Sequence, residues 1–101
     1  MTQAEAQALL ADCRRKIDAI DIELRDLLNR RAGIVDDVAR AKEVLAAPVY
    51  EPAREEEVVR KATTGNPGPL SDHALRHVFE AIMQEMRMIQ QVYLDRRQGK
   101  P

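Results

Sequence analysis

The fold is decided by residues 17–31, which read I-D-A-I-D-I-E-L-R-D-L-L-N-R-R. Apolar or small residues recur there every three or four positions, and the alternation extends in both directions along the chain. Its members form a heptad-like apolar seam: Leu10, Cys13, Ile17, Ile20, Leu24, Leu27, Ile34, Val38, Ala41 and Leu45. No proline precedes Pro48. The pattern predicts one long helix over about residues 5–46.

A helix of that length needs a partner along its sides. At about 1.5 Å per residue it would extend about 60 Å. A compact chain of 101 residues has a radius of gyration of only about 13 Å. We therefore expect the apolar seam to be covered by a second copy, in an intertwined homodimer.

Two further helices are expected after Pro48. Glu51 precedes Pro52, which suits the first helical position, so a short helix is predicted over about residues 52–63. The G-N-P-G-P run at 65–69 predicts a loop, and Ser71 is a suitable N-cap for a third helix, to about residue 97. The second helix is expected to bury Val58, Val59 and Ala62. The apolar stripe of the third helix consists of Leu75, Val78, Phe79, Ile82, Met83, Met86, Ile89 and Tyr93. The prediction is a single all-α domain, residues 1–101, with helices in the order long, short, long.

Composition excludes several classes of protein. A formal net charge of −1, with 33% charged residues, gives no basic footprint for nucleic acid. Cys13 is the only cysteine, so no internal disulfide is expected and a reducing compartment is favoured. Neither a signal peptide nor a membrane span is evident, and a cytoplasmic location is expected. His73 and His77 lie four residues apart but lack a convincing third ligand, so no metal is expected.

Two cations interrupt the face of the long helix. Arg31 falls on the heptad series that contains Ile17, Leu24 and Val38. Lys42 follows eleven residues later, close to three whole turns, and therefore lies on nearly the same face about 16 Å away. Arg31 could extend its guanidinium to solvent or meet a buried carboxylate. The two cations together could equally form a pocket for an anion, and the spacing leaves these interpretations open.

Other polar residues also have two interpretations. Arg14 lies about 25 Å before Arg31 along the helix, so it is either a surface residue or a contributor to a partner chain's site. Arg54 could pair with Glu51 or Glu57 on the surface of the second helix. Gln90 lies at the edge of the third helix's apolar stripe, where most glutamines are boundary residues.

Several segments together resemble the all-helical chorismate mutase family. They are R-R-K-I-D-A-I-D-I-E-L-R-D-L-L-N-R-R, A-R-A-K, P-V-Y-E-P-A-R-E-E-E-V and N-P-G-P-L, and the match covers about residues 9–94. The resemblance implies an intertwined dimer of three-helix chains with two shared active sites. It implies an isomerase that converts chorismate to prephenate, towards phenylalanine and tyrosine, with no cofactor. In this family the domain is often fused to, or bound by, another enzyme of aromatic biosynthesis.

The resemblance also implies a role for each polar residue. Arg31 and Arg54 would hold the substrate, and Arg14 would reach the site across the dimer. Lys42 and Gln90 would contact the ether oxygen, and Lys42 a carboxylate as well. Glu51 and Glu55 would lie near the substrate hydroxyl, whereas Glu56 and Glu57 are expected to be solvated charges. Met86 departs from the family, which often has a small or hydroxyl residue there, and this bears on the shape of the pocket.

Two alternatives remain beside the mutase. Isochorismate-pyruvate lyase shares the fold and the cationic pocket, but in that branch the acid of the Arg54-Glu55 pair tends to be lost. A non-catalytic helical dimer would need only the apolar seam and could lose Arg31 or Lys42. Here all the cationic positions are present.

Overall fold

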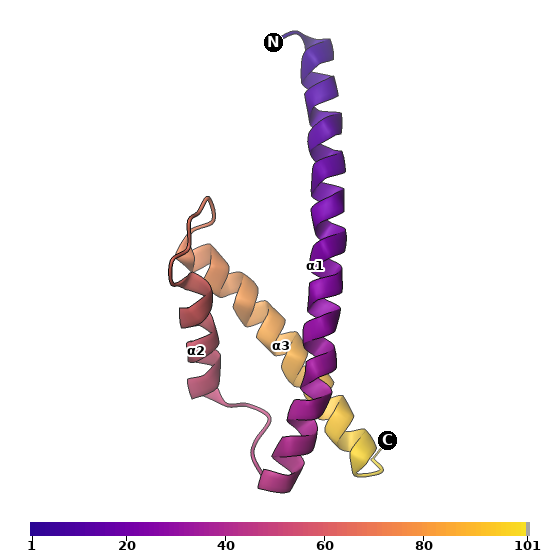
Figure 1. The fold of residues 1–101 in the computed structure, drawn as a ribbon, viewed down its shortest axis with the longest axis vertical. Helices are drawn as coiled ribbons and strands as arrows, with labels where there is room; N and C mark the ends of the chain where they lie inside the picture. Colours follow the sequence, from indigo (N-terminus) through magenta and orange to yellow (C-terminus); the bar gives the residue numbers. More distant parts are fainter. Residues whose placement is uncertain (101) are drawn as a thin grey trace. The chain divides into compact units, whose positions relative to one another are not determined.

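The computed structural model describes residues 1–100, which contain three helices and no strand (Figure 1). Helix α1 spans Gln3–Leu45, α2 spans Pro52–Thr63 and α3 spans Asp72–Arg97. The all-α prediction, with helices in the order long, short, long, is therefore confirmed. None of the helices in the described residues is both long enough and apolar enough to cross a bilayer.

Helix α1 begins two residues earlier than its apolar pattern indicates. The Glu5 backbone N–H donates to Thr2 Oγ1 at 3.1 Å, and the Thr2 N–H donates to the Glu5 carboxylate at 3.4 Å. This reciprocal arrangement is a capping box, which satisfies N–H groups that have no partner within the helix. The polar cap, rather than the first apolar residue, sets the start of the helix.

The chain divides into two compact units, Met1–Gly33 and a second that starts at Ile34. In the first unit the apolar seam is uncovered. Its side chains stay about half exposed: Leu10, Ile17, Ile20, Leu24 and Leu27 range from 49% to 55%. Cys13 is likewise exposed. Taken by itself, the first unit therefore leaves this apolar surface uncovered.

The second unit contains the core. The buried residues come from the end of α1, from α2 and from α3: Val35, Ala39, Val59, Met83, Gln90 and Leu94. Helices α2 and α3 pack against each other (Figure 1). Ile34 and Val38, which the seam predicted, are 64% and 37% exposed, whereas their neighbours Val35 and Ala39 are buried. This part of α1 has apolar residues on two adjacent faces, and the chain covers only one of them.

The end of α1 is fixed by its own backbone before Pro48 is reached. The Ala47 N–H donates to the Lys42 carbonyl at 2.9 Å, and the Ala46 N–H to the Glu43 carbonyl at 3.4 Å. Ala46 has a φ of 53°, the left-handed conformation of a Schellman motif, in which glycine is the usual residue. The closure turns the chain at Ala46, so that the residues after Pro48 can fold back toward Lys42.

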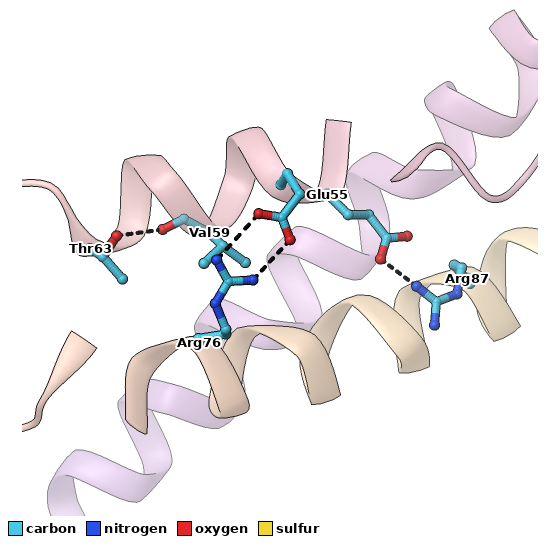
Figure 2. Close-up of polar contacts among 6 residues, drawn as sticks. Glu55, Val59, Thr63, Arg76 and Arg87 are labelled. Carbon is cyan, nitrogen blue, oxygen red and sulfur yellow. Dashed lines mark hydrogen bonds and ion pairs between the residues drawn. The ribbon is translucent and has the colours of Figure 1, made fainter. Parts of the chain in front are cut away.

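The starts of α2 and α3 agree with the sequence signals. Pro52 is the first residue of α2. The Ser71 side chain accepts from the Ala74 N–H at 3.0 Å and caps α3, as predicted. Figure 2 shows two arginines of α3, Arg76 and Arg87, each turned toward a carboxylate of α2. These ion pairs add to the apolar contact around Val59, which is only 2% exposed.

Candidate active site

Lys42 is held by the turn between α1 and α2. Its ammonium donates to the Val49 carbonyl at 2.9 Å and lies 3.2 Å from Glu51 Oε1. Only 13% of the lysine side chain is exposed. Glu51 stands at the N-cap position of α2, yet its carboxylate does not cap that helix. Because an ammonium has three donors, two such contacts leave Lys42 one donor for an anionic ligand.

Glu55 is held from α3. Arg87 Nη1 donates to Glu55 Oε1 at 2.5 Å, and both side chains are partly buried (Figure 2). The guanidinium carbon of Arg87 also lies 5.0 Å from the centre of the Tyr50 ring, a distance at which cation–π attraction is favourable. Among residues 1–100, no hydrogen bond reaches the second oxygen of Glu55. That oxygen is available to accept from a hydroxyl group.

Arg87 is not among the site residues expected from the sequence. Its partners lie far away in the sequence, and Arg87 follows Glu55 by 32 positions. The available signal was its position: Arg87 lies between Met86 and Met88 and three residues before Gln90, which places it nearly one helical turn from that amide.

Gln90 is a buried polar residue without a full set of partners. It is 7% exposed, and its Oε1 has no hydrogen-bond partner within the described residues. Leaving a buried polar group unpaired costs about 1–3 kcal/mol. Rotation of the amide can present either the oxygen or the NH₂ group to the same space. Gln90 is therefore suited to donate to, or accept from, a ligand that reaches it. Met86, one turn earlier, is partly buried.

Arg54 adopts the surface arrangement that its spacing allowed. It is 58% exposed and pairs with Glu57 on its own helix. This hydrogen bond, with a smaller effect from Lys61, lowers the pKa of the Glu57 carboxyl. Glu56 pairs with Arg76 of α3 at 2.8 and 3.2 Å, and that contact lowers the pKa of Glu56. Each glutamate thus has a cationic partner, but their side chains stay 68% and 41% exposed, so both remain solvated charges as expected.

Arg14 and Arg31 belong to the Met1–Gly33 unit. Arg14 is exposed and Arg31 is partly exposed. Neither forms an ion pair with a carboxylate of residues 1–100. Both guanidinium groups are thus uncommitted, and their alignment with Lys42 stays a prediction from the sequence.

No metal centre is evident among residues 1–100, where no three His, Cys, Asp or Glu side chains gather. The rings of His73 and His77 instead lie against each other, with centroids 4.4 Å apart. The polar groups available for a ligand are an ammonium, guanidinium groups, carboxylates and an amide. Of these, ammonium and guanidinium groups form strong charge-assisted hydrogen bonds with carboxylates.

The fold defines a class, that of small all-helical proteins with three helices in the order long, short, long. The family model for chorismate mutase type II matches residues 13–91, and the chain belongs to this family. A relative from Methanocaldococcus jannaschii, named chorismate mutase, is 29% identical over 94 residues, which are 90% of this chain and 93% of that protein.

Other relatives are larger. The bifunctional chorismate mutase/prephenate dehydratase of Neisseria gonorrhoeae is 39% identical over 77 residues, which are 76% of this chain. This chain spans only 21% of that protein's length. Among solved structures, the chorismate mutase of Helicobacter pylori in complex with prephenate has a TM-score of 0.81 and 31% identity. The alignment covers 87% of this chain and 96% of that one.

Proposed function

We propose that this protein is a chorismate mutase that converts chorismate to prephenate by a [3,3]-sigmatropic rearrangement, in the synthesis of phenylalanine and tyrosine. The family match over residues 13–91 carries the proposal. The groups in the candidate site add chemical support. Lys42 has donor capacity left beside Glu51, and Gln90 is a buried amide with an unpaired oxygen.

The reaction explains why these residue types suit the site. Chorismate carries two carboxylates, for which arginine and lysine are the natural partners. No nucleophile or proton transfer is needed, so the protein must hold a compact reactive conformer. It must also stabilise the negative charge that grows on the ether oxygen as the C–O bond breaks. In this proposal Lys42 and Gln90 donate to that oxygen.

The remaining residues bind and orient the substrate in this account. Arg31 clamps a carboxylate and Arg54 also holds the substrate, for which Arg54 must leave Glu57. That exchange costs little, because exposed ion pairs contribute only about 0–1 kcal/mol. Glu51 and the second oxygen of Glu55 accept from the substrate hydroxyl.

A homodimer with shared sites is part of the proposal. The apolar seam of the first unit is about half exposed, and a second copy would cover it. Arg14, which has no carboxylate partner in residues 1–100, would then enter the partner chain's site. Sedimentation velocity tests this directly. A dimer is expected at micromolar concentration, and a stable monomer that retains full activity would contradict the shared site.

The activity is tested by incubating the purified protein with chorismate and, separately, with isochorismate. Loss of chorismate with appearance of prephenate is expected. Pyruvate and salicylate from isochorismate would instead identify the lyase.

The fused relatives also support association with another enzyme of aromatic biosynthesis. Co-purification with a prephenate dehydratase from the same cells would test that part.

A further inference from the structure

Arg87 contacts two residues that flank Glu51 in the sequence. Its guanidinium lies over the ring of Tyr50, the residue before Glu51, at 5.0 Å. The same guanidinium donates to Glu55, one helical turn after Glu51, at 2.5 Å. The Glu55 N–H in turn donates to the Glu51 carbonyl at 3.1 Å, the first hydrogen bond of α2. One side chain of α3 therefore holds the start of α2 on both sides of Glu51.

The segment that Arg87 holds is the one that holds Lys42. Val49 supplies the carbonyl and Glu51 the carboxylate that contact the Lys42 ammonium. A shift of this turn would carry both contacts with it. Gln90 lies three residues after Arg87, about 4.5 Å along the same helix. Arg87 thus connects the support of the lysine to the helix that bears the glutamine.

We propose that Arg87 is a positioning residue: through Tyr50 and Glu55 it fixes the turn at residues 48–51, and with it the Lys42 ammonium, relative to Gln90 of α3. The inference rests on the proposed function, because its consequence for catalysis assumes that Lys42 and Gln90 act on one substrate. A guanidinium suits this task, because its plane can lie on an aromatic ring while its N–H groups bind a carboxylate.

The chain provides a matched control in Arg76. This residue also lies on α3 and also binds a carboxylate of α2, Glu56, through two hydrogen bonds (Figure 2). It lies 14 residues before Gln90, about 21 Å along the helix. Arg76→Met removes an ion pair between the same two helices without touching the turn that holds Lys42.

The experiment compares wild type with Arg87→Met, Arg87→Lys, Tyr50→Leu and Arg76→Met, by steady-state kinetics and by amide hydrogen exchange. Arg87→Met is expected to lower kcat roughly 10- to 100-fold with little change in KM, since misplaced catalytic groups act mainly on the transition state. Arg87→Lys should recover part of the loss, because it keeps the charge for Glu55 but cannot lie flat on Tyr50. Arg76→Met should retain the wild-type kcat.

Hydrogen exchange tests whether Arg87 holds the turn, independently of whether the protein is a chorismate mutase. Arg87→Met should speed exchange at the backbone N–H groups of Ala47 and Glu55, which donate to the carbonyls of Lys42 and Glu51. Arg76→Met should not change exchange at these two positions. If the wild type lacks mutase activity, the proposed function fails, while the exchange data still decide whether Arg87 holds the turn. Unchanged exchange and unchanged kcat in folded Arg87→Met would overturn the inference. If that variant does not fold, wild-type kcat in both Arg87→Lys and Tyr50→Leu would overturn it.

Discussion

Lys42 Nζ lies 3.2 Å from Glu51 Oε1, and this ion pair joins the last turn of α1 to the residue that precedes α2. The two residues are separated by a backbone closure at Ala46 and by Pro48. The contact therefore holds the lysine through a turn whose shape is set by the closure at Ala46 and by Pro48. In the proposed mutase this geometry aims the ammonium at the ether oxygen.

Glu51→Gln is expected to lower kcat about two- to fivefold, because Lys42 would lose a charged partner but keep the Val49 carbonyl. The effect is modest because 41% of the Glu51 side chain is exposed to screening solvent. Steady-state kinetics at low and high salt measure it. A loss of several hundredfold would contradict a role limited to holding Lys42 and accepting from the substrate hydroxyl.

Ala46→Gly is expected to stabilise the protein by about 1 kcal/mol, because alanine is disfavoured at a φ of 53° and glycine is not. For a chain of this size such a gain raises Tm by about 4–8 °C. Thermal unfolding at one fixed protein concentration measures the change, and Ala47→Gly is the control in the same turn. Equal or lower Tm for Ala46→Gly would show that this conformation is not strained.

The Glu56–Arg76 pair predicts a small, acid-sensitive contribution to stability. Hydrogen bonding and charge from Arg76 lower the Glu56 pKa from its ordinary value of 4.5. A lowered folded-state pKa means that the stabilisation is complete above 4.5 and disappears as the pH falls through the folded value.

Glu56→Gln should therefore be slightly less stable than wild type at neutral pH and equally stable in strong acid. Urea unfolding across that range measures the difference, which should also shrink in high salt because the pair is exposed. A difference that persists unchanged in strong acid would contradict an ionic origin.

The pH dependence of turnover tests the role of Gln90. An amide donates without titrating, so activity should persist well above neutral pH. Gln90→Glu should behave differently, because a carboxyl must be protonated to donate and burial raises its pKa. The variant is expected to lose activity steeply as the pH rises through about 6–8, while wild type does not. A steep loss in wild type over that range would count against Gln90 as the donor.

Much of the fold could be predicted because its signals are local. Pro52 and Ser71 mark the helix starts through their own backbone chemistry, and the apolar pattern marks the long helix. The start at Gln3 was missed although it is also local, since the Thr2–Glu5 capping box lies outside the apolar pattern.

Contacts between distant residues could not be read from the sequence. In the second unit, α1 has two apolar faces, either of which could be buried. The spacing of its apolar residues does not show that Val35 and Ala39 are the buried pair. The Arg87–Glu55 contact depends on how α3 packs on α2. The roles of Lys42 and Gln90 were reached by family resemblance rather than by spacing, and their action on a common substrate stays a prediction.

The most direct test is the turnover of chorismate by wild type and by Lys42→Ala, with prephenate identified as the product. Circular dichroism and sedimentation should first show that the variant retains its fold and oligomeric state. Under the proposed mechanism wild type forms prephenate, and the variant loses at least about a hundredfold in kcat, since a charged donor to the developing oxyanion is removed. Wild-type turnover in a folded Lys42→Ala variant would contradict it.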